Sequence, residues 1–219
     1  MIFGVSAEKI WTSVFQTIYM VTVPLAVGIL IGFPLAVALV ITRKGGIKQN
    51  KAVYTVISTI INIIRSVPFI ILIVYIMPLT KIIVGTRVGS TAALVPLICY
   101  IAPYLARLIE GALLDVDGGI VEAAQAMGAN TVQTVMKFML PEAFGSIVLG
   151  ITVGAIGLLG ATAMAGAVGG GGVGDLALTY GYQRFNQPLM TSTVIILICF
   201  VQVIQAVGNT ISKRVKHKK

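Results

Sequence analysis

IWTSVFQTIYMVTVPLAVGILIGFPLAVALVIT, residues 10–42, contains no charged side chain. An α-helix needs about 20 mainly apolar residues to cross roughly 30 Å of hydrocarbon, and this stretch is longer than that. It also exceeds the roughly 7–15 apolar residues of a secretory signal peptide, so we expect it to remain uncleaved. The stretch therefore predicts an integral membrane protein.

The composition of the whole chain agrees with this prediction. Hydrophobic residues make up 57% of the chain and charged residues 11%, whereas soluble domains have roughly 45–50% and about 25%. The two cysteines, Cys99 and Cys199, lie inside apolar runs and predict neither a disulfide framework nor a metal site. We expect an all-α membrane protein.

Further apolar runs define the other spans. The run between Lys51 and Lys81 is interrupted only by Arg65. The sequence predicts five transmembrane helices in a single domain of residues 10–212, over about residues 10–42, 54–79, 88–109, 143–165 and 187–211.

The basic residues predict the orientation, because cytoplasmic loops carry an excess of Lys and Arg. With the N-terminus outside, the cytoplasmic side would hold Arg43, Lys44, Lys48, Lys51, Arg107, Lys137, Lys213, Arg214, Lys216, Lys218 and Lys219. The outer side would hold only Lys9, Lys81, Arg87 and Arg184. We therefore expect the N-terminus outside and the C-terminus inside. Residues 213–219 would form a basic cytoplasmic tail beside anionic lipid headgroups, with no nucleic acid as a partner.

The segment of residues 107–142 departs from this pattern because it is acidic. It contains most of the acidic residues of the chain: Glu110, Asp115, Asp117, Glu122 and Glu142. An acidic segment is repelled by anionic lipid, so we expect it to bind a protein partner.

Capping residues divide this segment into two short helices. Asp117 is a suitable N-cap for the first, Gly128 ends it, and Asn130 or Thr131 caps the second. Apolar residues recur at helical spacing in the second helix and predict one apolar face: Val132, Val135, Met136, Met139 and Leu140. Pro141 is expected to restart the helix into the next span.

The same segment carries a motif. Glu122, Ala123 and Ala124, then Gly128, and finally Leu140 and Pro141 keep the spacing EAA-x3-G-x9-I-x-LP, with Phe138 in place of the isoleucine. This pattern resembles the EAA loop of permease subunits in bacterial ABC importers of type I. The resemblance implies a cytoplasmic pair of coupling helices between spans 3 and 4, within residues 115–141. ATPase subunits would dock on it and move the spans when they bind ATP. An ordinary helical hairpin packed on its own bundle remains the alternative.

Two further stretches extend the resemblance over residues 10–212, and they are most similar to methionine importer permeases. The first is Arg65-Ser-Val-Pro-Phe-Ile-Ile-Leu72, and the second runs from Met164-Ala-Gly-Ala-Val-Gly169 through Gly174 to Tyr180-Gly-Tyr182. The resemblance implies uptake of L-methionine, with D-methionine as a second candidate. It also implies a second copy of this chain, two ABC ATPase subunits and an external, usually lipid-anchored methionine-binding protein, in the bacterial plasma membrane. Permeases for polar amino acids or quaternary amines share the first stretch loosely, so these substrates stay open.

Four residues are candidates for the translocation pathway. Met164, near the end of a span, would act as an apolar gate or fill a packing gap. Arg65 would extend to the inner headgroups or lie beside an inner cavity. Gln202 and Gln205 share a helix face and would hydrogen-bond at a subunit contact or line the pore.

The sequence predicts no enzyme. Gly169, Gly171 and Gly174 match G-x-G-x-x-G, but the run follows a predicted membrane helix rather than a strand, so it indicates a tight turn. The chain contains no G-x-x-x-x-G-K-[ST] motif. We expect no catalytic residue, cofactor or metal site in this chain, and ATP and Mg²⁺ would bind to the partner ATPases. An ion-coupled secondary carrier and a structural membrane anchor are the alternative functions.

Overall fold

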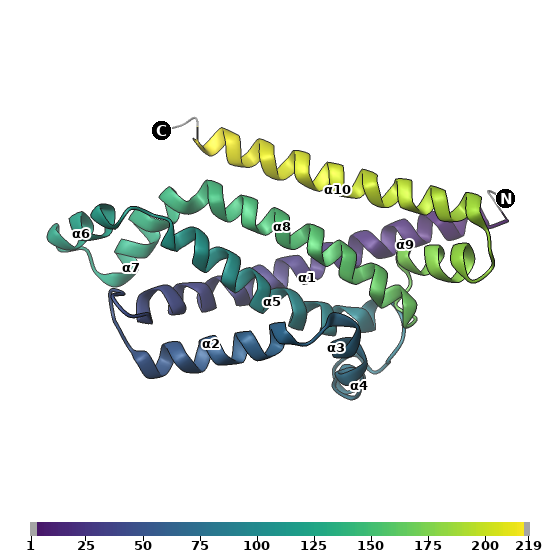
Figure 1. The fold of residues 1–219 in the computed structure, drawn as a ribbon, viewed down its shortest axis with the longest axis horizontal. Coiled ribbons are helices and arrows are strands. Elements are labelled where there is room, and N and C mark those ends of the chain that lie inside the picture. The colour runs from purple at the N-terminus through teal and green to yellow at the C-terminus, as the bar shows by residue number, and fades with distance from the viewer. Residues whose placement is uncertain (1–3, 217–219) are drawn as a thin grey trace. The chain divides into compact units, whose positions relative to one another are not determined.

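The computed structural model describes residues 4–216, and their regular structure is helical (Figure 1). In chain order the elements are α1 (Ala7–Thr42), α2 (Lys51–Ser66), α3 (Phe69–Tyr75), α4 (Met77–Val84), α5 (Ser90–Leu114), α6 (Gly118–Ala126), α7 (Thr131–Gln133), the π-helix η1 (Thr134–Met139), α8 (Leu140–Ala167), α9 (Gly172–Asp175), the π-helix η2 (Leu176–Tyr182) and α10 (Gln187–Lys216). The prediction of an all-α fold is confirmed.

Four helices among the described residues are long and apolar enough to cross a membrane: Ala7–Thr42, Ser90–Leu114, Thr131–Ala167 and Gln187–Val215. The pair α2 and α3 is a fifth candidate, with a bend of 99° between its halves. The sequence predicts one span over about 54–79, and the structure divides this region into two helices at Pro68. Proline lacks an N–H group and disfavours helical geometry in the residue before it, which ends α2 at Ser66.

The chain divides into two compact units, which we describe separately. Unit 1 comprises the described residues of Met1–Val27, Val67–Ile101 and Ala155–Gln205, and unit 2 comprises those of Gly28–Ser66, Ala102–Gly154 and Ala206–Lys219. The division falls within α1, α5, α8 and α10 rather than at linkers, and a single domain of residues 10–212 stays a prediction. Residues 213–216 of the predicted tail continue α10, and residues 217–219 lie outside the described part.

Unit 2 is held together by close helix packing. Leu39 of α1, Ile61 of α2 and Ala106 of α5 form a buried cluster. A Cβ atom on Gly208 of α10 would lie 2.0 Å from Oγ1 of Thr152 on α8, so only glycine fits at this contact. Absence of a side chain at such positions lets helix backbones approach closely, as is common in membrane helices.

The glycine run of unit 1 lies between the end of α8 and the short helix α9. Gly169, Gly171 and Gly172 have φ angles of 85°, 77° and 84°, which confirms the predicted tight turn. Two side chains of α1 fasten this turn, because Gln16 Oε1 accepts from the N–H of Gly172 and Thr17 Oγ1 from the N–H of Val173, both at 2.9 Å. Neither these bonds nor the helices α9 and η2 were predictable from the local sequence pattern.

Candidate functional site

The segment between α5 and α8 begins with a capped helix. The Oδ1 atom of Asp117 accepts a hydrogen bond of 2.7 Å from the N–H of Gly119, so Asp117 caps α6 as predicted. At the other end, Gly128 has a φ angle of 79°, and its N–H donates to the carbonyl of Gln125 at 2.9 Å. Glycine adopts this left-handed conformation without a steric penalty, so the chain reverses here.

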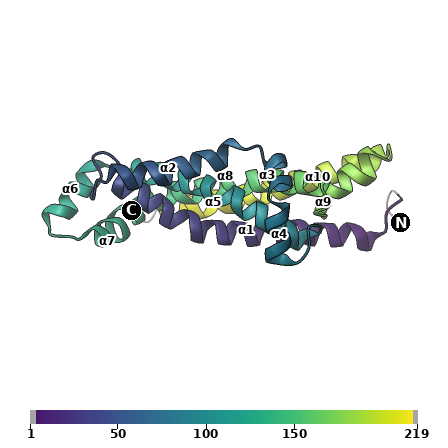
Figure 2. The same ribbon diagram turned by 90° about the horizontal axis from the view of Figure 1, so that it is seen from below.

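A capping box starts the second helix. The N–H of Gln133 donates to Oδ1 of Asn130, and the N–H of Asn130 donates to Oε1 of Gln133, each at 2.9 Å. The predicted cap at Asn130 is therefore confirmed. This reciprocal pair satisfies two backbone donors that helix geometry leaves without partners. Figure 2 shows α6 and α7 close together at one end of unit 2.

Pro141 is expected to restart the helix, and α8 does begin beside it at Leu140, but the helical path is not broken there. Residues 131–167 form a continuous helical stretch through α7, η1 and α8. The N–H of Leu140 bonds to the carbonyl of Val135, five residues back, which is π-helical geometry. We attribute the continuity to this wider turn, which makes room for the proline ring that would otherwise strike the preceding turn.

The predicted apolar face of this helix is divided in the structure. Val135 and Met139 are buried, whereas the side chains of Val132 and Met136 are 70% and 47% exposed. Met127, at the end of α6, is also 70% exposed. The buried half is enclosed within unit 2, where Val135 lines a hollow together with Phe33–Ile41 of α1. The exposed half is an apolar surface of the kind that a protein partner covers.

The residues of the EAA motif also divide into buried and exposed ones. Ala124 is fully buried, so its small side chain serves the packing of α6 inside unit 2. Glu122, Ala123, Gly128 and Pro141 are exposed, and Leu140 is half-buried. The motif residues thus lie close together in the segment from α6 through α7 to the start of α8, and most of them are at the surface. We call α6 and α7, residues 118–133, the hairpin.

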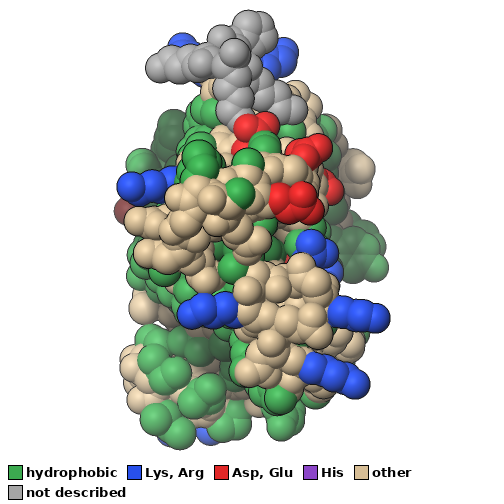
Figure 3. Space-filling model, turned by 90° about the vertical axis from the view of Figure 1, so that its left-hand side faces the viewer, with side chains coloured by type: hydrophobic (Ala, Val, Ile, Leu, Met, Phe, Trp, Pro, Cys, Tyr) green, Lys and Arg blue, Asp and Glu red, His purple; other side chains and the backbone are tan. Residues whose placement is uncertain are grey.

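Two hollows adjoin this hairpin in unit 2. One has a volume of about 410 Å³ and is lined by Glu122 and Gln125 of α6 together with Arg43 and Gly46 after α1. The other, of about 300 Å³, lies between Phe33–Ile41 of α1 and Thr131–Met136. Figure 3 views the end that carries α6, where acidic side chains gather in the upper part and several basic ones lie below. The surface around α6 and α7 therefore combines charged side chains, exposed apolar side chains and two hollows, and a partner protein could contact all three.

The structure places the four pathway candidates in different units. Met164, on α8 in unit 1, is 49% exposed. Gln202 and Gln205 lie on one exposed face of α10, also in unit 1. Arg65 ends α2 in unit 2, with its guanidinium carbon 5.6 Å from the centre of the Tyr104 ring.

A group of polar residues in unit 2 was missed by the sequence analysis. Arg107 and Glu110 belong to α5 and form an ion pair with an N–O distance of 2.8 Å, in which Glu110 is buried. The guanidinium of Arg107 also donates to Ser58 Oγ at 2.5 Å and to Asn62 Oδ1 at 2.9 Å, both on α2. Opposite charges three residues apart were a signal for this pair.

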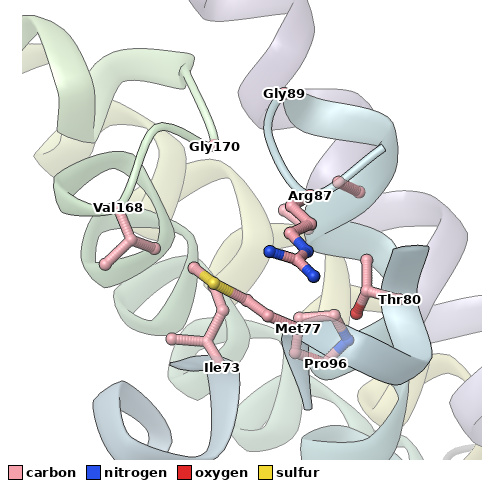
Figure 4. A pocket seen from close by; sticks show the side chains of 10 residues that line it. Ile73, Met77, Thr80, Arg87, Gly89, Pro96, Val168 and Gly170 are labelled. Atoms are coloured by element: carbon pink, nitrogen blue, oxygen red, sulfur yellow. The ribbon is translucent and has the colours of Figure 1, made fainter. Parts of the chain in front are cut away.

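A small cavity in unit 1 is lined by Arg87, Met77, Ile73 and Val168 (Figure 4). The side chain of Arg87 extends into it toward Met77 in this view. Its volume is about 10 Å³, which is close to the space that one water molecule needs. The cavity is too small for an amino acid. Among the described residues, no group of three or more His, Cys, Asp or Glu side chains is arranged to hold a metal ion.

Comparison with known proteins identifies the family. Residues 28–217 match the model of the family described as binding-protein-dependent transport system inner membrane component. The chain is 46% identical to a probable D-methionine transport system permease protein of Vibrio cholerae, over 99% of this chain and 96% of the relative. It is 42% identical to a methionine import system permease protein of Bacillus subtilis, over 95% of this chain and 94% of the relative.

Comparison with solved structures supports the same family. The fold matches a chain in the inward-facing MetNI methionine ABC transporter with a TM-score of 0.93 and 42% identity, over 96% of this chain and 99% of that chain. The protein belongs to the family of inner membrane components of binding-protein-dependent transport systems.

Proposed function

We propose that this chain is the membrane-spanning permease subunit of an ATP-driven methionine importer. The observation that carries the proposal is similarity along nearly the whole chain to permeases named for methionine, at 46% and 42% identity. L-methionine and D-methionine are the proposed substrates. In this proposal the chain provides the translocation pathway and contains no ATPase site of its own.

The partners follow from the same proposal. Two copies of the chain line one pathway, two ABC ATPase subunits bind ATP and Mg²⁺, and an external methionine-binding protein delivers the substrate. The hairpin of α6 and α7 faces the cytoplasm and docks on an ATPase subunit. Its exposed Met127, Val132 and Met136 provide apolar contact area for docking, and Glu122 adds a charge at the surface.

Met164, Arg65, Gln202 and Gln205 remain the proposed pathway residues. The exposure of Arg65, Gln202 and Gln205 supports this role, because a polar side chain exposed on a membrane helix has to face water or protein. Met164 is 49% exposed. A residue that only fills a packing gap would be enclosed.

Uptake by purified components tests the proposed function. The chain, its cognate ATPase and its binding protein are reconstituted in liposomes, and ATP-dependent uptake of radiolabelled L-methionine is measured with excess D-methionine, choline or histidine as competitor. We expect uptake that requires ATP and that only unlabelled L- or D-methionine blocks. Substrate-stimulated ATPase activity without methionine uptake would keep the importer and reject the substrate. Failure to assemble with any ATPase would reject the importer.

Two variants test the coupling hairpin. Gly128→Pro cannot adopt the observed φ of 79°, and Glu122→Lys reverses an exposed charge. We expect each to uncouple uptake from ATP hydrolysis or to prevent assembly, while the chain still inserts into the membrane. Gly85→Ala, in the left-handed cap of α4 in unit 1, is the matched control for backbone strain and should leave the coupling ratio unchanged. Wild-type transport in both hairpin variants would contradict the proposed docking role.

A further inference from the structure

Polar residues form a stripe along one face of α2. They follow one another three or four residues apart, which places them on one side of a helix: Lys51, Thr55, Ser58, Thr59, Asn62, Arg65 and Ser66. Thr55, Thr59, Asn62 and Arg65 are all exposed. The stripe runs the full length of α2.

A different face of α2 is also exposed, and it is apolar. Val56, Ile60 and Ile63 are 58%, 54% and 61% exposed. The third side of the helix is covered, where Ile61 is buried against Leu39 and Ala106. The helix therefore presents two unlike surfaces outside its own core.

The two surfaces require different surroundings in a membrane. The apolar face is suited to hydrocarbon or to an apolar protein surface, whereas hydroxyl, amide and guanidinium groups in a membrane face water or a polar partner. A row of such groups over four turns of helix needs a continuous polar environment. An isolated polar residue would instead be satisfied by one neighbouring helix.

Charged side chains of α5 support one edge of the stripe. Arg107 donates to Ser58 and Asn62 and is balanced by Glu110 at 2.8 Å. The Arg65 guanidinium lies over the ring of Tyr104, also on α5. These contacts hold the helices together from the side, and Thr55 and Thr59 are left exposed beside them. Such a charged network is typical of a wall beside water rather than of a surface against lipid.

We propose that the polar stripe of α2 lines a water-filled part of the translocation pathway, with Thr55, Thr59 and Asn62 as the residues that face the passing substrate. This inference rests on the proposed function of the chain as a permease. Short hydroxyl and amide side chains can replace some of the water around the charged amino and carboxyl groups of an amino acid without binding it tightly.

Cysteine accessibility tests this proposal in the assembled transporter. Cys99→Ala and Cys199→Ser first remove the native thiols. Single cysteines then replace Thr55, Thr59 or Asn62 on the stripe, and Val56, Ile60 or Ile63 on the apolar face. A charged, membrane-impermeant maleimide is added to inverted vesicles and, separately, to right-side-out vesicles, and the labelling rate is measured.

We expect the stripe cysteines to react at least about tenfold faster than the apolar-face cysteines from one side of the membrane, because the reactive thiolate forms in water and not in hydrocarbon. Trapping the ATPases with vanadate, or adding excess methionine, should change the rate at the stripe only. Equal protection of both sets would show that protein covers the stripe, and equal reactivity would show that α2 is hydrated on all sides. Either result would overturn the proposal.

Methionine uptake by the same wild-type vesicles separates the two proposals. If the vesicles transport no methionine but the stripe cysteines are labelled as expected, the proposal of methionine as substrate fails, and the proposal that the stripe lines a pathway stands. Each cysteine variant is first checked for assembly with the ATPase. A variant that does not assemble is replaced by Ser66→Cys on the stripe or Val53→Cys on the apolar face, so the comparison can always be completed.

Discussion

Glu110 is a buried carboxylate, and Arg107 is the residue that compensates it in unit 2. Removing one partner of a buried ion pair leaves an uncompensated charge, which costs about 3–5 kcal/mol when the pair is fully enclosed. The side chain of Arg107 retains 18% exposure, so we expect Arg107→Met to destabilise the chain by roughly 3 kcal/mol or less.

Comparing Arg107→Met with the double variant Arg107→Met/Glu110→Gln shows whether the loss of stability comes from the uncompensated charge or from lost packing. Thermal unfolding in detergent should show a large fall in Tm for Arg107→Met, and the added Glu110→Gln change should restore part of it. Arg214→Met, at an exposed position of α10, is the control and should change Tm little. If the double variant is no more stable than the single one, the ion pair is not the cause.

Gly208 is a second residue whose replacement has a defined steric consequence. Its added Cβ would lie 2.0 Å from Oγ1 of Thr152, so Gly208→Ala should destabilise the chain by about 1–3 kcal/mol. Thr152→Ala in the same chain should recover part of the loss, measured as Tm in detergent. Gly160→Ala is the matched control, because apart from its chain neighbours and the backbone of its own helix no described atom lies within 4 Å of its Cβ position. Equal effects of the two alanine substitutions would contradict close packing at Gly208.

At the scale of the element, the capping box sets where α7 begins. Asn130→Ala removes one bond of the box and should reduce the stability of this helix start by about 1 kcal/mol. Asn50→Ala removes a comparable cap, since Asn50 Oδ1 accepts from the N–H of Val53 at the start of α2.

The comparison of these two variants separates helix stability from coupling. Both should lower Tm slightly, but only Asn130→Ala should lower the amount of methionine transported per ATP hydrolysed. The ratio is measured in proteoliposomes with the cognate ATPase. An equal fall in the ratio for both variants would indicate that any loss of a cap has this effect.

Helix starts and ends could be predicted from the sequence where they depend only on a few neighbouring residues. Asp117, Gly128 and Asn130 act as caps in the structure as they do in the sequence analysis, because capping depends on a few neighbouring residues. The run of residues 10–42 is recovered within α1 because its length alone requires a span. The hairpin was therefore predictable from sequence.

Features that depend on distant residues were not predictable in this way. The continuity of the helix at Pro141 depends on how many residues the preceding turn contains, and the exposure of Val132 depends on what else packs there. The bonds from Arg107 join α5 to residues 49 and 45 positions earlier in the chain. Pro68 is a sequence signal for a bend between α2 and α3. The bend angle of 99°, however, is set by tertiary packing.

For the whole molecule, the charge distribution predicts orientation. In cells expressing the assembled complex, Ser6→Cys should be labelled by an impermeant maleimide from outside, and Gln125→Cys only in inverted vesicles. Both residues are exposed, and both variants are made without the native cysteines. The opposite pattern would place the α6–α7 hairpin outside and would remove the basis for ATPase docking.

The bonds from Gln16 and Thr17 to the glycine turn also bear on how the protein is made. Each joins residues 156 positions apart, so α1 leaves the ribosome long before the glycine turn that supplies these partners. During co-translational insertion the side-chain amide of Gln16 must stay hydrated or find a temporary partner, whereas the Thr17 hydroxyl already donates to the carbonyl of Ser13 within α1. Chains that end before residue 172 would keep this unmet demand, and membrane quality-control proteases would have a chemical signal by which to recognise them.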